Sequence, residues 1–525
     1  MKRALAAAVF LVAALNCAHA QPVVTLRPSA VLNELKLFSS MYPRTEGSAG
    51  ERAAIGNITS SLDRLGVRYT QQSFEDIEGT HSYSSSIDVS IRGKKPDELL
   101  FIVPIDQPLN ASKANDGSIN LALALGMIES LSRTVPPISL RFLFLGGEFG
   151  AGPAYPIGTK QFLDNFYPDF PVIALYLDFR SVPNRTNITS GGIRIVAPYW
   201  LINRCSSAMD QAGLYYLVRG NENQIFRLGL VSSPPAINPY LQQGYPALEL
   251  SGIEGSLPAD RYTDWVSSFE QFFNNFLEAN SSGFPTAWDK HYLFFQIRSF
   301  SFIVPERAYV LIVIVLLGLV LAYPIIYRER FLRYLTTIGR NVLSIPLLLA
   351  VAFVFLLLGT LLVEGIFVVR NFPTMWRQAP FLFFSCKVAA ALFLFALLYR
   401  FLKVLPFSRN GRFYGAAAIL LLLMDSIVLG LFDFSLAYYF VWALMWSVLF
   451  SMVRSRALKI VILAISTAWL LKAIVDVFTL PALDVIRIMI LSRISGNAII
   501  AIVILPFLFM IIRVDMMFRH PRRKQ

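Results

Sequence analysis

The chain has few cysteines, and their positions exclude a disulfide framework. Its 525 residues include three, Cys17, Cys205 and Cys386. Cys17 lies in an N-terminal leader-like segment and Cys386 in a long apolar run, so Cys205 is alone in the polar part of the chain. That part must therefore be stabilised by a hydrophobic core, which a stretch of this length can bury.

Histidine is equally scarce, with His19, His81, His291 and His520 the four in the sequence. Only His81 lies well inside the polar half. Its setting, Gly79-Thr80-His81-Ser82, is typical of a solvated loop. A metal site built on several imidazole ligands is therefore not expected in this half.

Charged residues make up 15% of the chain and are unevenly distributed. Residues 306–525 contain 23 Lys and Arg against 8 Asp and Glu, a net charge of +15, which leaves −2 of the total +13 for residues 1–305. The basic residues cluster between the apolar runs, so the positive-inside rule accounts for the positive charge. No nucleic-acid partner is expected.

The first twenty residues have the pattern of a signal peptide. Met1-Lys2-Arg3 precedes an apolar stretch, Ala4–Ala14, and Ala18-His19-Ala20 forms an A-x-A cleavage site. The apolar stretch is too short to span a bilayer. We predict cleavage after Ala20, with lipidation at Cys17 as the alternative.

The C-terminal part, residues 301–525, is predicted to form about seven transmembrane helices. The apolar runs lie near 308–327, 342–369, 379–399, 413–432, 435–453, 457–478 and 495–513. Arg and Lys accumulate on alternate connections, which predicts an extracytoplasmic N-terminal domain and a cytoplasmic C-terminus. The protein is expected in a cell membrane, or in the endoplasmic reticulum membrane if it is eukaryotic.

Five ionisable residues fall within these runs: Glu364, Lys387, Asp425, Lys472 and Asp476. Charges at bilayer depth are costly, so each is either a functional residue or half of a pair that locks helices together. Lys472 and Asp476 are four residues apart and are expected to pair.

Residues 21–300 alternate between helical and strand patterns. Helices are predicted at 30–40, 49–65, 121–132 and 159–165, and strands at 86–91, 99–105, 139–144 and 172–177. This alternation predicts an α/β domain with a mixed sheet between helical layers.

Several segments of this domain resemble the M28 family of zinc aminopeptidase-like proteins. The similar stretches are Arg44–Glu51, Ala114–Ser118, Phe142–Glu148, Ala174–Asp178 and Tyr245–Leu250, in the family's order. The resemblance implies a three-layer α/β fold and a site for two zinc ions, held by two His, two Asp and one Glu, with a further Glu as general base.

The sequence departs from that pattern at the ligands. Pro104-Ile105-Asp106 stands where the family has His-x-Asp, and Glu148-Phe149 where it has Glu-Glu. No histidine follows the strand at 245–250. Asp116 and Asp178 remain as vestigial metal ligands, and Glu148 as the general base if the protein is active.

Two further residues complete the expected site. Asp106 corresponds to the carboxylate that would have oriented a metal-bound histidine. Arg261 is hypothesised to form a salt bridge with Asp116 or Asp178 in place of the metal.

These observations favour an inactive, membrane-anchored M28-like protein with no cofactor. Its exported domain is then a binding or scaffold module for other membrane proteins, or for a peptide or glycolipid ligand. One alternative is an active zinc-dependent aminopeptidase or amidase of the membrane. A second alternative is a transporter or receptor that works through the transmembrane helices.

Overall fold

The computed structural model describes most of the chain. The described residues are 23–75, 83–150, 155–218, 226–227, 229, 231, 234–289, 292–297, 300–326, 328–372, 374–402, 407–408, 410–432, 437–453, 455–479 and 484–519. The predicted leader, its Cys17 and His81 lie outside them. The chain forms two compact units, one mainly before Lys290 and one mainly after Phe302, which we call the N-terminal domain and the helical region.

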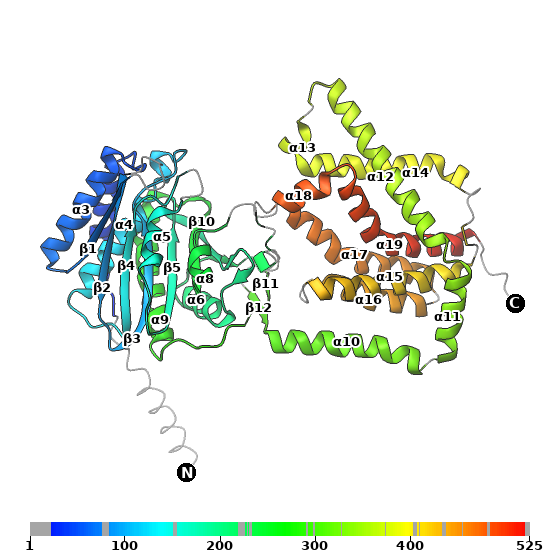
Figure 1. Ribbon diagram of the computed structural model, residues 1–525, viewed down its shortest axis with the longest axis horizontal. Helices are drawn as coiled ribbons and strands as arrows, with labels where there is room; N and C mark the ends of the chain where they lie inside the picture. The colour runs from blue at the N-terminus through cyan, green and yellow to red at the C-terminus, as the bar shows by residue number, and fades with distance from the viewer. Residues whose placement is uncertain are drawn as a thin grey trace, which may run out of the picture. The chain divides into compact units, whose positions relative to one another are not determined.

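An eight-stranded mixed sheet forms the centre of the N-terminal domain (Figure 1), in the order β1-β2-β4-β3-β5-β10-β6-β9. The strands are β1 Thr70–Glu75, β2 Tyr83–Ile91, β3 Lys95–Pro104, β4 Ile138–Leu145, β5 Val172–Asp178, β6 Pro183–Thr189, β9 Tyr216–Val218 and β10 Ala247–Ser256. The neighbours β4, β3, β5 and β10 run parallel, with Phe101 of β3 opposite Phe142 and Leu175. Their carboxyl ends therefore meet at one edge of the sheet.

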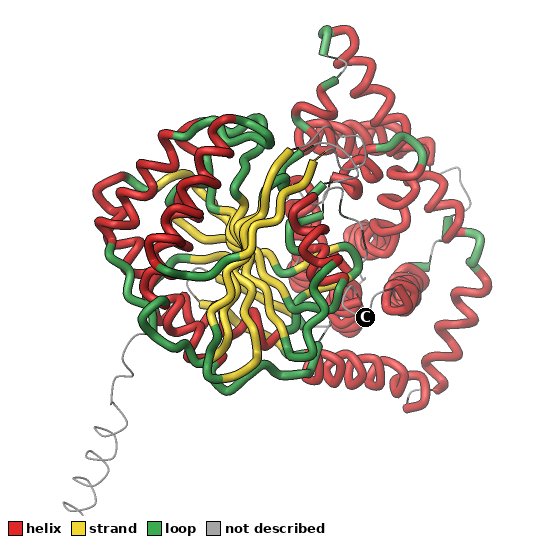
Figure 2. Tube along the Cα trace, turned by 60° about the vertical axis from the view of Figure 1, so that its left-hand side comes forward, coloured by secondary structure: helices red, strands yellow, loops and turns green. Residues whose placement is uncertain are grey.

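Helices cover both faces of this sheet, which makes the three-layer arrangement visible in Figure 2. They are α2 Pro28–Ser40, α3 Ala49–Leu65, α4 Ser118–Leu131, α5 Ile157–Asp164, α6 Tyr199–Gln211, α8 Asn238–Gln242 and α9 Tyr262–Asn280. Helix α2 packs against α4 and α9, and α6 packs against α9, whereas α5 packs against α8. The other described elements before residue 305 are short. They are η2 Lys113–Asn115, η3 Ala259–Arg261, the pair β7 Gly191–Gly192 and β8 Ile195–Val196, and β11 Leu293–Ile297 with β12 Phe300–Val304.

The core explains why these segments fold as they do. Leu99–Val103 is an unbroken apolar run that is buried along its whole length, as expected for a central parallel strand covered on both faces. The Phe101 ring lies 5.3 Å from that of Phe142 and 5.4 Å from that of Phe273 on α9. The predicted mixed α/β fold is confirmed, and each predicted helix and strand of this domain overlaps an observed element.

Helix α3 shows how a short sequence stretch determines local structure. The Ser48 hydroxyl accepts a hydrogen bond from the Glu51 amide, and the Glu51 carboxyl accepts one from the Gly47 amide, which together cap the helix N-terminus. A Cβ on Gly50 would lie 2.0 Å from the Met41 carbonyl oxygen, so only glycine fits at that position. The resulting close packing holds the segment after α2 beside α3.

The helical region contains ten helices within the described residues. They are α10 Glu306–Ile326, α11 Arg328–Arg340, α12 Ser344–Val369, α13 Met375–Gln378, α14 Pro380–Leu402, α15 Gly411–Phe432, α16 Ala437–Met452, α17 Arg456–Thr479, α18 Asp484–Leu491 and α19 Ser495–Arg519. Buried side chains of α11, α12, α15, α16, α17 and α19 share one hydrophobic cluster.

Five of these helices are long and apolar enough to cross a membrane, counting only the described residues. The five segments are Ser344–Val369, Pro380–Leu398, Gly411–Gly430, Arg456–Val475 and Ser495–Met517. They indicate a membrane-associated protein. The other two predicted spans fall on α10 and on α16, whose described apolar part, Tyr439–Met452, is shorter. The count of seven therefore stays a prediction.

An ion pair in the helical region joins α12 to the segment that precedes α19. Glu364 on α12 binds Arg493, which lies between α18 and α19, with 2.8 Å between Oε2 and Nη2. Lys387 on α14 is buried and donates to the Ile490 carbonyl oxygen at 3.3 Å. We expected Lys472 to pair with Asp476. The side chain of Asp476 lies outside the described atoms, so this pairing stays a prediction.

Candidate functional site

The candidate site residues gather where the parallel strands end. Asp106 follows β3 by two residues, Glu148 follows β4 by three, and Asp178 is the last residue of β5. Asp116 lies between β3 and α4, directly after η2. Because β4, β3 and β5 are neighbours in the sheet, the fold places all four carboxyl groups at the same edge.

Asp116 is bound by an arginine of this chain. Arg44 Nη1 lies 3.4 Å from Asp116 Oδ2, and Arg44 Nη2 donates to the Asp116 carbonyl oxygen at 2.6 Å. The other carboxylate oxygen of Asp116 accepts a hydrogen bond from the Ser118 amide. Arg44 is 1% exposed and Asp116 5%, so this is an ion pair in the interior.

The Arg44 guanidinium is almost fully used by the protein. It also donates to the carbonyl oxygens of Phe38 and Ile105 and to the Ser118 hydroxyl. Burial lowers the pKa of Arg44, while the neighbouring Asp116 raises it. Arg44 therefore ties α2, the end of β3 and the start of α4 together.

Asp178 is bound by a second arginine. Arg180 Nη2 lies 2.9 Å from Asp178 Oδ1 and 3.1 Å from Oδ2. The same guanidinium lies 4.5 Å from the ring centroid of Phe149, a cation–π contact. Burial raises the pKa of Asp178 to about 6, and Arg180 opposes that shift. Phe149 and Arg180 thus occupy the surroundings of a carboxylate that would have to bind a metal.

Glu148 caps a helix. Its Oε1 accepts a hydrogen bond from the Thr159 amide at 2.7 Å, in the first turn of α5. Its Oε2 lies 2.8 Å from the Thr159 hydroxyl and 3.2 Å from the Tyr176 hydroxyl. Carboxyl groups stabilise helix N-termini in this way, and Pro156, the residue before α5, offers no side-chain cap of its own.

The environment of Glu148 also changes its protonation. Burial raises the pKa of Glu148 to about 8, and the nearby Asp106 charge adds to the shift, whereas the bonds from Thr159 and Tyr176 oppose it. At neutral pH the group is mostly a neutral acid. A neutral acid whose two oxygens are both hydrogen-bonded is poorly placed to take a proton from water.

Asp106 fixes the loop that carries Glu148. Its two carboxylate oxygens accept hydrogen bonds from the backbone amides of Glu148 and Phe149, at 3.0 and 2.9 Å. Burial raises the pKa of Asp106 to about 6, and these two bonds oppose the rise. Asp106 therefore orients the loop that carries Glu148.

The residues present do not fit a dizinc centre. Asp116 and Asp178 are each bonded to a guanidinium, and Pro104 and Phe149 cannot bind a metal. Across the parts of the chain that the structure describes, there is no group of three or more His, Cys, Asp or Glu side chains that could hold a metal ion. A zinc site needs about four such ligands.

The hypothesis that Arg261 neutralises these carboxylates is wrong. Arg261 is exposed at the start of α9, and the carboxylates of Asp116 and Asp178 are paired with Arg44 and Arg180 instead. Arg44 belongs to the stretch that resembles the M28 family, so the sequence contained a signal for it. Tyr176 also belongs to such a stretch, whereas Thr159 does not. The contacts of both with Glu148 depend on how α5 and β5 approach it.

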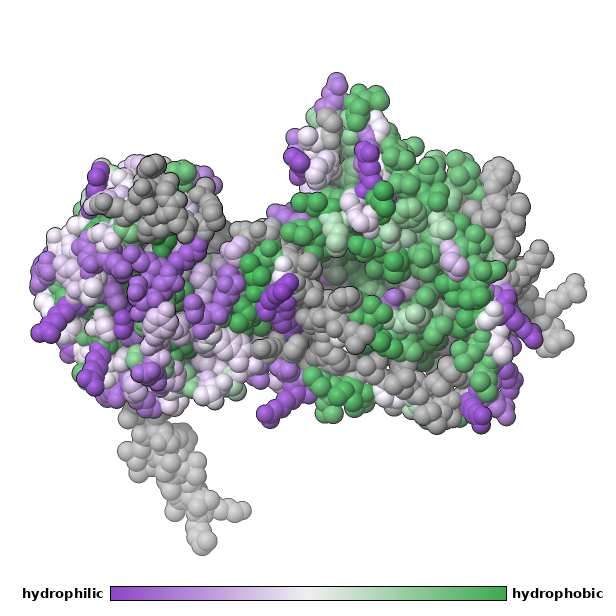
Figure 3. Space-filling view, in the orientation of Figure 1, coloured by the Kyte–Doolittle hydropathy of each residue, from purple (hydrophilic) through white to green (hydrophobic). Residues whose placement is uncertain are grey.

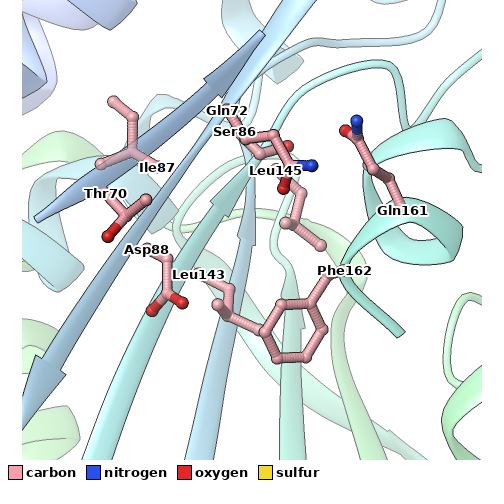
Figure 4. A pocket seen from close by; sticks show the side chains of 10 residues that line it. Thr70, Gln72, Ser86, Ile87, Asp88, Leu143, Leu145, Gln161 and Phe162 are labelled. Carbon is pink, nitrogen blue, oxygen red and sulfur yellow. The ribbon is translucent and has the colours of Figure 1, made fainter. Parts of the chain in front are cut away.

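A small pocket in the same domain has none of these four carboxyl groups among its lining residues. It has a volume of about 60 Å³ and lies between β1, β2, β4 and α5, with Asp88, Gln161 and Phe162 among its lining residues (Figure 4). Asp88 Oδ1 and Gln161 Oε1 are buried and have no hydrogen-bond partner in the described structure. A space of this size and polarity accommodates a few water molecules.

Sequence comparison relates both parts of the chain to one family. The sequence model of the first domain of the TP_0564 family matches residues 126–304, and that of its second domain matches residues 342–525. The chain is similar to both domains of the TP_0564 family. No curated protein matches the chain.

The solved structures that resemble this protein match about half of the chain. A glutaminyl cyclase from an Acidobacteriales bacterium is 16% identical with a TM-score of 0.40, over 51% of this chain and 98% of that protein. The Porphyromonas gingivalis glutaminyl cyclase is 13% identical with a TM-score of 0.36, over 48% and 98%. A zinc-dependent exopeptidase from Parabacteroides distasonis is 15% identical with a TM-score of 0.34, over 49% and 99%. Their activities are not transferred to this chain at such similarity.

Proposed function

We propose that the protein is a membrane-anchored, M28-like binding or scaffold module without metallopeptidase activity. The observation that carries this proposal is that side chains of the protein itself bind the carboxyl groups of the candidate site. Arg44 and Arg180 neutralise the two candidate ligands, and the candidate base Glu148 caps α5. Each group that would perform catalysis therefore has a structural task.

A zinc ion would compete with Arg44 for the Asp116 carboxylate. A zinc ion would have to displace Arg44 from Asp116 and leave a buried guanidinium without its counter-charge, which costs several kcal/mol. It would gain two carboxylates and no imidazole or thiolate, a ligand set that suits zinc poorly. The domain is therefore more stable with its internal arginines than with metal.

The membrane helices give the proposed module its location. We place the N-terminal domain on the extracytoplasmic side, because Arg and Lys accumulate on the opposite connections of the helices. Its partners would be other membrane proteins, or a peptide or glycolipid ligand.

Zinc content and hydrolysis test the loss of catalysis. The full chain is purified in detergent, incubated with excess zinc, dialysed and analysed by elemental mass spectrometry beside an Asp116→Asn/Asp178→Asn variant. We expect the two proteins to contain equal amounts of zinc. We also expect the wild type to hydrolyse aminoacyl amides no faster than a Glu148→Gln variant does. Near-stoichiometric zinc that the double variant loses, together with hydrolysis that depends on Glu148, would establish the active-enzyme alternative instead.

Photo-crosslinking in cells tests the binding role. A photoreactive residue is placed at Leu109 or Tyr167, which are 84% and 81% exposed, with the exposed Arg133 as a matched control. A binding module should give a discrete adduct from one of the apolar positions and none from the control. Absence of any adduct at both positions would contradict this part of the proposal.

A further inference from the structure

Asp425 is a carboxyl group in the middle part of a membrane-spanning helix, and the described part of the chain offers its buried oxygen no partner. It lies in α15, within the apolar segment Gly411–Gly430. At 1.5 Å per residue, it is about 21 Å from the start of α15 and about 10 Å from its end. Within the described residues, its buried Oδ2 has no hydrogen-bond partner.

The helices packed against α15 offer no counter-charge at this depth. Helix α16 contains no Asp, Glu, Lys, Arg or His, and its tyrosines, Tyr438 and Tyr439, lie at its start. Helix α19 is uncharged from Ser495 to Ile512. Its Arg513 lies beside Gly415, ten residues before Asp425, because a Cβ on Gly415 would overlap the Arg513 guanidinium.

The third helix packed against α15 is α11, whose charged and titratable residues are Arg328, Glu329, Arg330, Arg333, Tyr334 and Arg340. Helix α11 lies at the end of the bundle where α19 ends (Figure 1), which is also the end where Gly415 meets Arg513. Its charges are therefore near the beginning of α15, about 20 Å along the helix from Asp425.

The immediate surroundings of Asp425 are apolar. Met424, Ile427 and Val428 are 53%, 47% and 49% exposed on the same stretch of α15. The described surface of the helical region is mainly hydrophobic between more polar ends (Figure 3). The backbone donors of a continuous helix are already used within the helix, so they cannot stabilise a carboxylate here.

An ionised carboxylate in these surroundings would cost several kcal/mol, whereas a carboxylic acid carries no charge. We infer that Asp425 is a proton-binding site of the membrane region, a neutral carboxylic acid at physiological pH. Glu364 provides the internal contrast, because Arg493 binds both of its carboxylate oxygens. The inference concerns a different part of the chain from the proposed function and does not depend on it.

Infrared spectroscopy of the full-length protein in lipid vesicles tests this directly. A carboxylic acid has a carbonyl stretching band that a carboxylate lacks. We expect several carboxylic acid bands in the wild type at neutral pH, including that of Glu148, with one component lost in Asp425→Asn and none lost in Glu364→Gln. Asn has the shape and neutrality of the protonated group, so Asp425→Asn should fold as the wild type does.

A labelling experiment gives a second result that needs no variant. Dicyclohexylcarbodiimide adds to protonated carboxyl groups in apolar surroundings and forms a stable N-acylurea without a leaving group. Mass spectrometry of the labelled wild type should find the adduct on the peptide that contains Asp425 and none on the peptide that contains Glu364.

Two outcomes would overturn the inference. The first is an infrared spectrum in which Asp425→Asn loses no carboxylic acid band. The second is labelling of Glu364 in preference to Asp425. Either would mean that Asp425 is ionised and that a cation from another protein or from lipid neutralises it.

Discussion

Buried acidic side chains meet different surroundings in the N-terminal domain and in the helical region. Asp106, Asp116 and Asp178 lie where strands end and loops begin, so backbone amides and two arginines are available to them. Asp425 lies inside a continuous helix, where the backbone offers no free donor. The comparison teaches that the position of a carboxyl group in the fold decides which donors and cations it meets.

Loss of the Arg44–Asp116 pair is expected to have the largest effect on stability. Arg44→Met removes a guanidinium with five hydrogen bonds from the interior and leaves Asp116 uncompensated, which should lower the free energy of unfolding by about 3–5 kcal/mol. Thermal unfolding of the full chain in detergent measures the loss. Arg261→Met, at an exposed arginine without these bonds, is the control and should change stability by less than about 0.5 kcal/mol. Equal melting temperatures for the two variants would contradict the assignment.

The second prediction concerns the close packing of two helices, α12 and α14, in the helical region. A Cβ on Gly359 of α12 would lie 2.7 Å from the Lys387 carbonyl oxygen and 2.8 Å from the Ala391 nitrogen of α14. Gly359→Ala should therefore separate the two helices and cost about 1–3 kcal/mol. Gly365→Ala in the same helix meets open space and serves as the control. The melting temperatures in detergent measure both, and a Gly359→Ala protein as stable as Gly365→Ala would refute the close contact.

The last expected effect is a dependence of stability on pH in the N-terminal domain. Burial raises the pKa of Glu51 to about 7 and that of Glu148 to about 8, against an ordinary value of 4.5. Between pH 4.5 and 8 the folded state therefore holds more protons than the unfolded state. The free energy of unfolding consequently falls as pH rises through this window.

Glu148→Gln isolates one group of this pH effect, because Gln is uncharged and similar in shape. The variant should match the wild type near pH 5 and lose fewer degrees of melting temperature between pH 5 and pH 8. Identical slopes for the two proteins would show that Glu148 is ionised in the folded state throughout.

Much of the fold followed from residue patterns. The helix expected at 49–65 coincides with α3, and the strand expected at 172–177 lies within β5. The edge strands were harder, because β1, with the sequence TQQSFE, has no apolar alternation to mark it. Such a strand exists because β2 supplies its hydrogen-bonding partner, which is a tertiary property.

The candidate site was only partly predictable. Glu148, Asp116 and Asp178 were expected from the resemblance of their segments to the M28 family, and the structure does bring them to one edge of the sheet. Their partners were not expected, because Arg44 is 72 residues away from Asp116 in the sequence. Arg180, by contrast, is only two residues from Asp178, and its pairing could have been considered from the sequence.

The sequence by itself determined the apolar helices and the scarcity of histidine, because hydrophobic length and residue type are local properties. The tertiary structure decided which groups bind Asp116, Asp178 and Glu148, and which described carboxyl groups have no partner. Ion pairs and caps depend on which side chains the folded backbone brings within about 3 Å of each other. Arg44 binds Asp116, Glu148 caps α5, and Asp425 lacks a described partner for that reason.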